Sequence, residues 1–212
     1  MTSTNLSANR ILSIYKSRVT IIDLMKRLDY DVSQYEEFSI HNIDSMFSNN
    51  QMDMKLDREK DKHRIYIKYL LNIKQFKKEH LDTMVEDLYE IENVLEKKDT
   101  LIVIVNDKPN DTIKSYLIYL FERYNIFIIA FYLKQLQFNI LDHTLVPKAF
   151  VLTNEEVEEM MVKYNVKVLT QLPEISRFDP HAMAIGLRPN QVIRIERSSD
   201  TALVGINYRV CV

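Results

Sequence analysis

Two continuous apolar runs constrain the fold of this chain more than any other feature. They are TLIVIV at residues 100–105 and IFIIAF at residues 126–131. Runs of this kind, without polar alternation, are typical of strands that are buried on both faces of a sheet. The segment between them places Ile113, Leu117 and Leu120 at helical spacing. The sequence therefore predicts a strand, a helix and a second strand of a parallel α/β unit.

The preceding segments extend this pattern. Residues 64–70 alternate as a strand does, and residues 81–95 place their apolar side chains on one helical face. Residues 10–28 also have the spacing of an amphipathic helix, and Ser33 with Glu36 predicts a capping box before a short helix. Together these elements predict an α/β domain, a sheet flanked by helices, over residues 1–141. The polar, charge-dense segment at 49–62 within it predicts a solvated loop or a mobile connection.

A different composition begins near residue 142. Thr153 and Glu156 have the spacing of a capping box, and a short amphipathic helix follows them. Asp179 and Pro180 suit the N-cap and first position of a helical turn, and Gly186 suits its C-terminal end. Two alternating segments then predict a pair of strands. Residues 142–212 therefore predict a small α+β domain.

Composition narrows the range of functions. The 212 residues are 46% apolar, with a formal net charge of -2, so a core is expected and a surface that grips nucleic acid throughout is not. With only Gly186 and Gly205, the chain lacks phosphate-binding loops and the nucleophile elbow of hydrolases. No apolar run reaches the ~18 residues that cross a bilayer, and the polar N-terminal segment predicts an intracellular protein.

The last 70 residues carry an ordered set of motifs. These are H-x-LVP from His143, QLP-x-I from Gln171, DP-x-A from Asp179, V-x-x-I-x-R-x-S-x-TA from Val192, and YRV from Tyr208. In this order they resemble the fifth, shared component of eukaryotic nuclear RNA polymerases, which has a shorter homologue in the archaeal enzyme. The N-terminal segment NRILSIYKSRVTIIDLMKRLDYDVS is similar to the start of the eukaryotic form, whose N-terminal jaw domain the archaeal form lacks.

The resemblance implies a non-catalytic subunit of a multisubunit DNA-dependent RNA polymerase. In this family the C-terminal assembly domain, here residues 142–212, docks on the largest subunit beside neighbouring small subunits. The jaw domain, here residues 1–141, lies near downstream duplex DNA or contacts transcription factors. We therefore expect no cofactor, no metal, no membrane association and no obligate homo-oligomer. The location would be the nucleus for a cellular protein, and a virion or cytoplasmic viral factory for a protein of a large DNA virus.

The resemblance also implies which residues dock on other subunits. These matched positions are His143, Pro147, Leu172, Pro173, Asp179, Pro180, Gly186, Arg197, Ser199, Thr201, Tyr208 and Arg209. Basic residues of the first domain are candidates for DNA proximity: Lys16, Arg18, Lys26, Arg27, Lys74, Lys77 and Lys78. For each of these seven, a solvated helix flank is the structural alternative.

Four positions depart from the family pattern. Ala149 replaces a histidine, Met183 replaces an arginine, and Asn190 and Leu203 replace glycines. Asn tolerates a left-handed backbone, whereas a left-handed Leu is strained, so we expect the chain near Leu203 to bend differently. The loss of arginine at Met183 implies a changed partner surface.

A second function class is a free-standing nucleic-acid-binding protein or metal-dependent nuclease. Asp53 and Glu59, each beside or near a lysine, are the nearest candidates for metal-binding carboxylates. Both lie in the segment that predicts a solvated loop rather than at the end of a buried strand, which favours the polymerase subunit.

Overall fold

The structure, a computed structural model, describes residues 2–73, 75–199 and 201–212, with side chains from residue 8 onward. The chain divides into two compact units, Met1–Asn139 and Ile140–Val212. The sequence placed the boundary between residues 141 and 142. Both units are mixtures of helices and strands, and each contains one four-stranded sheet.

The sheet of the first unit has the strand order β1-β2-β3-β4. Its strands are β1 (Met54–Arg58), β2 (His63–Leu70), β3 (Thr100–Val105) and β4 (Phe127–Tyr132). The three strands β2, β3 and β4 are parallel, and β1 pairs antiparallel with β2 at the edge. The two continuous apolar runs form the two neighbouring strands β3 and β4, and every residue of β3 is buried.

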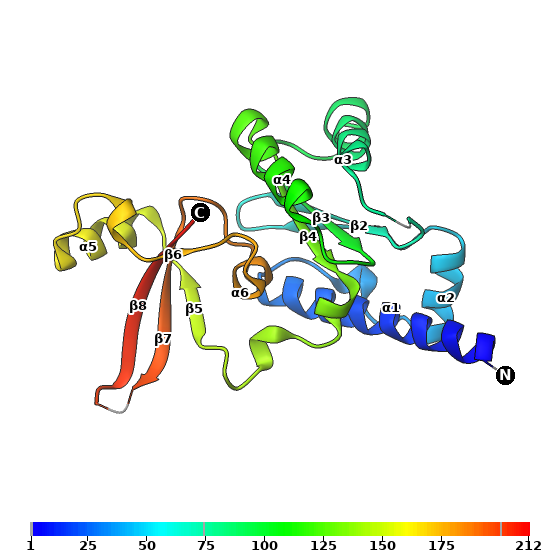
Figure 1. Ribbon diagram of the computed structural model, residues 1–212, viewed down its shortest axis with the longest axis horizontal. Coiled ribbons are helices and arrows are strands. Elements are labelled where there is room, and N and C mark those ends of the chain that lie inside the picture. Colours follow the sequence, from blue (N-terminus) through cyan, green and yellow to red (C-terminus); the bar gives the residue numbers. More distant parts are fainter. Residues whose placement is uncertain (1, 74, 200) are drawn as a thin grey trace. The chain divides into compact units, whose positions relative to one another are not determined.

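Helices cover both faces of this sheet, with α3 and α4 on one face and α1 on the other (Figure 1). The helical segments are α1 (Thr2–Arg27), η1 (Ser33–Tyr35), α2 (Ile40–Ser48), α3 (Lys78–Val85), the π-helical η2 (Glu86–Ile91), α4 (Asp111–Tyr124) and η3 (Leu133–Leu136). The side chain of Asn110 caps α4 by accepting from the Ile113 amide at 2.9 Å. The left-handed Asn125, with φ 57°, ends it. The parallel β-α-β-α-β order predicted for this part is thus present from β2 to β4.

Two local predictions were wrong. Ser33 and Glu36 do not cap a helix, because Ser39 is the N-cap of α2 and accepts from the Asn42 amide. The predicted loop at 49–62 contains the edge strand β1 and its turn to β2. Buried Met54 and Leu56 alternate with exposed Lys55 and Asp57, so one face of this strand packs and the other is charged, a pattern that resembles a polar loop.

The second unit contains β5 (Lys148–Val151), β6 (Glu174–Ile175), β7 (Val192–Ser199) and β8 (Leu203–Cys211). The strand order is β5-β7-β8-β6, and only the β6–β8 pair is parallel. Its helical segments are η4 (Ile140–Asp142), α5 (Asn154–Tyr164), η5 (Leu169–Gln171) and α6 (Pro180–Ala184). The predicted capping box of α5 is confirmed, because Thr153 and Glu156 exchange side-chain to backbone hydrogen bonds.

The β7–β8 pair separates two small apolar clusters of the second unit. Val192 and Val210 pack with Met160 of α5 in one cluster. Ile193 and Cys211 pack in the other with the α6 region. Successive residues of a strand point to opposite faces, so this strand pair supplies both clusters. Burial in the second cluster raises the pKa of the Cys211 thiol to about 11.

The backbone near Leu203 differs from the expectation. Asn190 adopts the left-handed conformation at φ 68°, and Leu203 adopts it too, at φ 58°. The chain therefore keeps the left-handed backbone at position 203 with a residue that is strained in it. The Leu203 side chain is 88% exposed, so its own burial does not offset this strain.

Replacing this residue tests the strain. We expect Leu203→Gly to raise the free energy of unfolding by about 0.5–1 kcal/mol, because the left-handed penalty is removed and the greater freedom of unfolded glycine offsets part of the gain. Leu203→Ala, which keeps the Cβ atom, is the matched control and should unfold at the wild-type urea concentration. An equal gain for alanine and glycine would contradict this explanation.

Candidate docking site

Rigid turns connect the elements of the second unit. The Asp179 carboxylate accepts from the His181 amide at 2.8 Å and caps α6, with Pro180 at its first turn. Gly186, at φ 65°, follows the helix, and the Leu187 amide donates back to Ala182 at 2.9 Å. The predicted cap, proline and glycine positions are confirmed. They direct the chain from β6 into β7 without a long flexible loop.

A second set of contacts holds the C-terminal segment in place. The Val210 amide donates to the carbonyl of Pro173 at 3.0 Å, and the Val212 amide donates to Ile175 at 2.9 Å. The Arg209 guanidinium donates to the Glu174 carbonyl at 2.8 Å. Pro173 and Arg209 therefore tie β8 to β6 within the unit.

Most of β8 has a strand on one side only. The short β6 pairs with β8 only at Val210 and Cys211. Along Leu203–Arg209 no other described strand pairs with the edge that faces away from β7. Two apolar side chains on this stretch, Val204 and Ile206, are 55% and 50% exposed. The second unit thus presents a free strand edge with apolar side chains.

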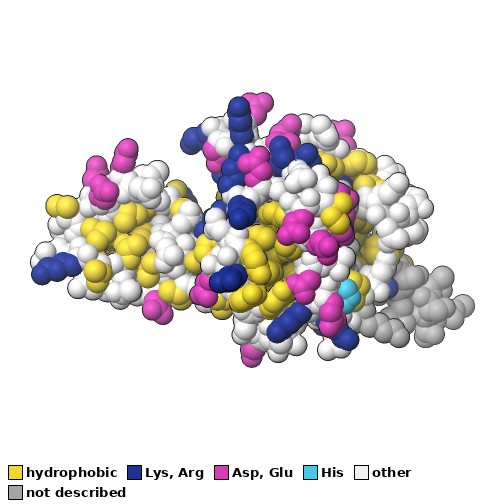
Figure 2. Space-filling model, turned by 90° about the horizontal axis from the view of Figure 1, so that it is seen from above, with side chains coloured by type: hydrophobic (Ala, Val, Ile, Leu, Met, Phe, Trp, Pro, Cys, Tyr) yellow, Lys and Arg dark blue, Asp and Glu magenta, His cyan; other side chains and the backbone are white. Residues whose placement is uncertain are grey.

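Aromatic residues lie beside this edge. The rings of Tyr208 and Tyr164 have centroids 5.5 Å apart, and Tyr208 packs against the cluster that contains Met160. Desolvation, and then the neighbouring Tyr164, raise the pKa of Tyr208. On the face drawn in Figure 2 the second unit exposes apolar side chains among charged ones.

The residues that resemblance assigns to docking divide into two groups. Leu172, Pro173, Asp179, Gly186, Tyr208 and Arg209 pack, cap or bond within the second unit. Pro147 is half-buried and lies directly before β5. At the β7–β8 turn, the hydroxyl oxygens of Ser199 and Thr201 are 3.4 Å apart. His143, Pro180, Arg197 and Thr201 are exposed. Their contact with another subunit stays a prediction.

The basic residues of the first unit have different environments. Lys16 and Lys77 are exposed. Lys26 pairs with Glu36 at 3.0 Å and Arg27 pairs with Asp23 at 3.3 Å, both nitrogen to oxygen. Lys78 lies 5.2 Å from the centroid of the Tyr116 ring, and Lys74 lies outside the described residues. On the face in Figure 2, basic and acidic side chains of the first unit are interspersed.

Arg18 requires a correction, because it is not on a solvated flank. It is 2% exposed, and its Nη1 donates to the Met52 carbonyl at 3.0 Å. The guanidinium lies over the rings of Tyr35 and Phe38, at 5.8 and 5.2 Å from their centroids. Desolvation lowers its pKa. Arg18 therefore connects α1 to the segment before β1 and is not placed to meet a phosphate.

The two carboxylates considered for a metal site, Asp53 and Glu59, have different surroundings. Asp53 accepts from the Tyr66 hydroxyl at 3.1 Å and from the Tyr69 amide at 3.2 Å. Glu59 is exposed in the turn between β1 and β2. Among residues 2–73, 75–199 and 201–212, no group of three or more His, Cys, Asp or Glu side chains could hold a metal ion. The geometry thus gives Asp53 a structural role.

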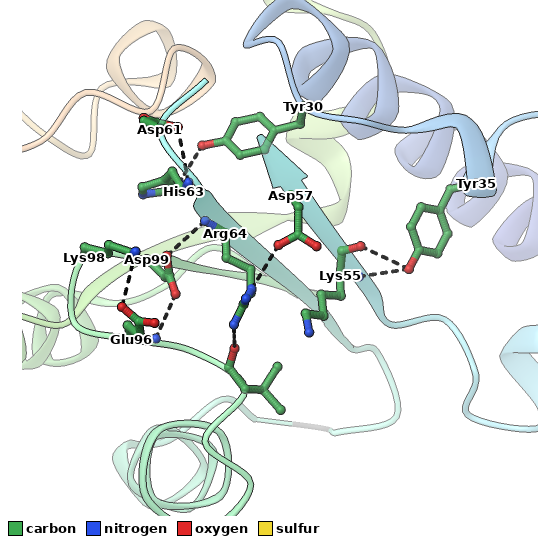
Figure 3. Close-up of polar contacts among 11 residues, drawn as sticks. Tyr30, Tyr35, Lys55, Asp57, Asp61, His63, Arg64, Glu96, Lys98 and Asp99 are labelled. Atoms are coloured by element: carbon green, nitrogen blue, oxygen red, sulfur yellow. Dashed lines mark hydrogen bonds and ion pairs between the residues drawn. The ribbon is translucent and has the colours of Figure 1, made fainter. Parts of the chain in front are cut away.

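Carboxylates elsewhere in the first unit also serve backbone and arginine partners (Figure 3). Buried Asp99 accepts from the Arg64 amide at 2.9 Å and from the Glu96 amide at 2.8 Å. Arg64 in turn donates to Asp57 at 2.9 Å. This network fixes the starts of β2 and β3.

Within the described part of the chain, no helix is long and apolar enough to cross a membrane.

Comparison with known proteins identifies the family. A family model described as RNA polymerase Rpb5, C-terminal domain, matches residues 138–211. The chain is also 45% identical over 76 residues to DNA-directed RNA polymerase subunit Rpo5 of Thermococcus kodakarensis, a match that covers 92% of that subunit and 36% of this chain. The chain belongs to the Rpb5 family of RNA polymerase subunits.

Eukaryotic members of the Rpb5 family extend the match. The subunit rpabc1 of DNA-directed RNA polymerases I, II, and III from Dictyostelium discoideum is 29% identical over 209 residues, which cover 96% of this chain and 98% of the relative. The RPABC1 subunit of Caenorhabditis elegans is 45% identical over 78 residues, 37% of this chain and 36% of the relative. The family resemblance of the sequence motifs is thereby confirmed.

The cap of α6 gives a stability prediction for this Rpb5-family chain. Asp179→Ala should lower the free energy of unfolding by about 1 kcal/mol, because the His181 amide loses its acceptor at the helix start. Asp179→Asn is the matched control, since asparagine caps about as well. Urea unfolding of the three full chains checks this, and wild-type stability of the alanine variant would show that Asp179 is not an effective cap.

The turn between β1 and β2 gives a pH prediction. Hydrogen bonding from the Arg58 guanidinium holds the pKa of Asp61 at about 2. The stabilisation by this lowered pKa is complete above the ordinary value near 4 and is lost as the pH falls toward about 2. NMR titration of the Asp61 carboxyl carbon should show its midpoint rising toward 4 in Arg58→Gln. Arg64→Gln, which removes the partner of Asp57, should leave the Asp61 midpoint unchanged.

Proposed function

We propose that this chain is a non-catalytic subunit of a multisubunit DNA-directed RNA polymerase. The observation that carries the proposal is the match to a Dictyostelium polymerase subunit over 96% of this chain, which includes both structural units. The residues agree with this function. Of the two carboxylates considered for a metal site, Asp53 accepts from the Tyr66 hydroxyl and the Tyr69 amide, and the second unit exposes a strand edge with apolar side chains.

The second unit is the assembly domain that docks on the largest subunit and neighbouring small subunits. An archaeal relative supports this assignment, because 76 residues of this chain match 92% of its length. The family model at 138–211 covers nearly the same residues as the second unit, Ile140–Val212. A part that corresponds to a nearly complete polymerase subunit must carry what that subunit needs to join the enzyme. The rigid turns at Pro173 and Asp179 reduce the ordering cost of binding.

The first unit is the jaw, which lies near downstream duplex DNA or contacts transcription factors. Among the seven candidate residues, the exposed Lys16 and Lys77 are the ones we assign to phosphate oxygens. Lys26 and Arg27 already have acidic partners, which weakens their attraction for DNA. Two phosphate contacts alone would bind DNA weakly, so the jaw guides a duplex that the assembled polymerase already holds.

The location follows from the assembly. The relative that matches nearly the whole chain is a subunit of the eukaryotic polymerases I, II and III, so we place this chain in a nucleus. The named relatives are cellular proteins of archaea and eukaryotes and give no support to the viral alternative.

Affinity purification tests the assembly role. A tag on the full chain, expressed in its own cells, should recover the two largest polymerase subunits in amounts equal to the tagged chain. The purified chain alone, incubated with DNA and Mg²⁺ or Mn²⁺, should not cleave it. Recovery of the chain without polymerase subunits, together with DNA cleavage that Asp53→Asn abolishes, would replace this function by that of a nuclease.

Salt dependence tests the jaw contacts. In the assembled polymerase, Lys16→Gln and Lys77→Gln together should reduce the slope of the logarithm of DNA affinity against the logarithm of salt concentration by about 2, since each phosphate contact contributes roughly 0.9. Lys163→Gln, on α5 of the second unit, is the control and should leave the slope unchanged. If the double variant keeps the wild-type slope, the jaw contacts a protein factor rather than DNA at these lysines.

A further inference from the structure

We propose that the free edge of β8 binds an extended segment of a partner subunit as an added β-strand. The inference rests on the assembly role proposed above and names the recognition mode of the docking surface. Main-chain hydrogen bonds to Ile206 and Tyr208 provide the contact, and apolar side chains beside them select the partner segment. The partner is thus a polypeptide in extended conformation, not a helix or a nucleic acid.

The hydrogen bonds around the end of β8 establish which backbone groups face the free edge. Cys211 donates to Gln191 at 2.9 Å and accepts from Asn190 at 2.9 Å, both on the β7 side. Val210 and Val212 donate in the opposite direction, to Pro173 and Ile175 of the β6 segment. Backbone groups alternate in direction along a strand. Even-numbered residues of β8 therefore point their N–H and C=O groups away from β7.

The same alternation continues beyond the end of β6. Ile206 and Tyr208 are even-numbered, and β6 pairs with β8 only at Val210 and Cys211. Their backbone N–H and C=O groups consequently face the side on which no described strand pairs with this part of β8. Water hydrogen-bonds these groups in the free chain, and an extended segment with its own row of backbone donors and acceptors can replace it along the edge.

The length of the β7–β8 hairpin gives an independent reason for a partner. The hairpin projects from the body of the second unit as a two-stranded ribbon (Figure 1). The pairing runs from Val192 with Val210 to Ser199 with Leu203, whereas β5 joins β7 only as far as Glu196. A two-stranded ribbon that buries little apolar surface is marginally stable in water. An added strand would widen this part of the sheet.

The side chains define the chemistry of the partner segment. Val204, Ile206 and Tyr208 are spaced two residues apart in β8, and the pairing with β7 is uninterrupted. Their side chains therefore lie on one face of the sheet. On the same face, Phe150 of β5 pairs with Arg194, and the Arg194 guanidinium lies 5.1 Å from the centroid of its ring. A strand added beside Ile206 would place every second side chain on this face. We therefore expect alternating apolar residues in the partner.

Other occupants fit the edge less well. A nucleic acid offers phosphate charge, but Val204 and Ile206 are apolar and half exposed. A second copy of this chain could pair edge to edge, yet the left-handed Leu203 ends the strand at the hairpin turn and leaves a short edge for a symmetric contact. A segment of another polymerase subunit needs only to be extended over a few residues.

A proline substitution tests the main-chain contact directly. Ile206→Pro removes an N–H group that points away from β7, so the pairing with β7 stays intact and the full chain should unfold near the wild-type urea concentration. Asn207→Pro is the orientation control: its N–H group faces β7, and the variant should unfold at a much lower urea concentration. Ile206→Thr changes the same side chain but keeps the N–H group, and it controls for lost apolar contact.

Competition during assembly provides the measurement. Each tagged full-length variant is coexpressed with untagged wild type, and its share in purified polymerase is determined by mass spectrometry. We expect the incorporated share of Ile206→Pro to fall about tenfold, and that of Ile206→Thr about threefold or less. In wild-type polymerase, hydrogen exchange at the amides of Ile206 and Tyr208 should be at least tenfold slower than in the free chain.

Three results would overturn the added-strand mode. They are equal incorporation of Ile206→Pro and Ile206→Thr, unchanged hydrogen exchange at both amides in the polymerase, and a wild-type dimer in sedimentation that Ile206→Pro dissociates. The first two would leave a side-chain interface, and the third would assign the edge to a second copy. In all three cases the chain can still enter the polymerase, so failure of this inference is distinguishable from failure of the assembly role.

Discussion

The β7–β8 strand pair is the element on which the second unit depends. It supplies Val192 and Val210 to one small apolar cluster and Ile193 and Cys211 to the other. Neither cluster alone is large, and a unit of this size is near the lower limit at which a single core suffices. Because one strand pair serves both faces, the register that buries Val192 also fixes the projecting part of the hairpin. The stability of the core and the position of the free edge thus follow from the same pairing.

Elements with strong local signals could be predicted from the sequence. The apolar runs gave β3 and β4 because strands buried on both faces need no alternation. The caps at Thr153 and Asp179 were readable because side-chain oxygens at fixed spacing satisfy the first amides of a helix. Strand β1 was missed because only one face is buried, and its apolar residues alternate with charged ones within a longer polar segment.

The position of Arg18 could not be predicted for a different reason. A helical projection places it with other basic residues of α1, but its burial depends on Tyr35, Phe38 and the Met52 carbonyl, which are distant in sequence. Helical periodicity describes one element at a time. It contains no information about the segment that folds back over a charged side chain, so the DNA-proximal set included a residue of the interior.

The docking set shows a related limit of motif reasoning. Many motif residues make the unit rather than meet a partner: Asp179 caps α6, and Pro173 accepts from Val210. Motifs identify the family because caps and tight turns demand particular side chains. A free strand edge makes no such demand, since any non-proline residue supplies an N–H group and a carbonyl. The recognition surface of a strand-pairing protein therefore depends on its register and on the direction of its backbone groups, which here follow from the β7–β8 pairing and from the hydrogen bonds of Val210 and Cys211.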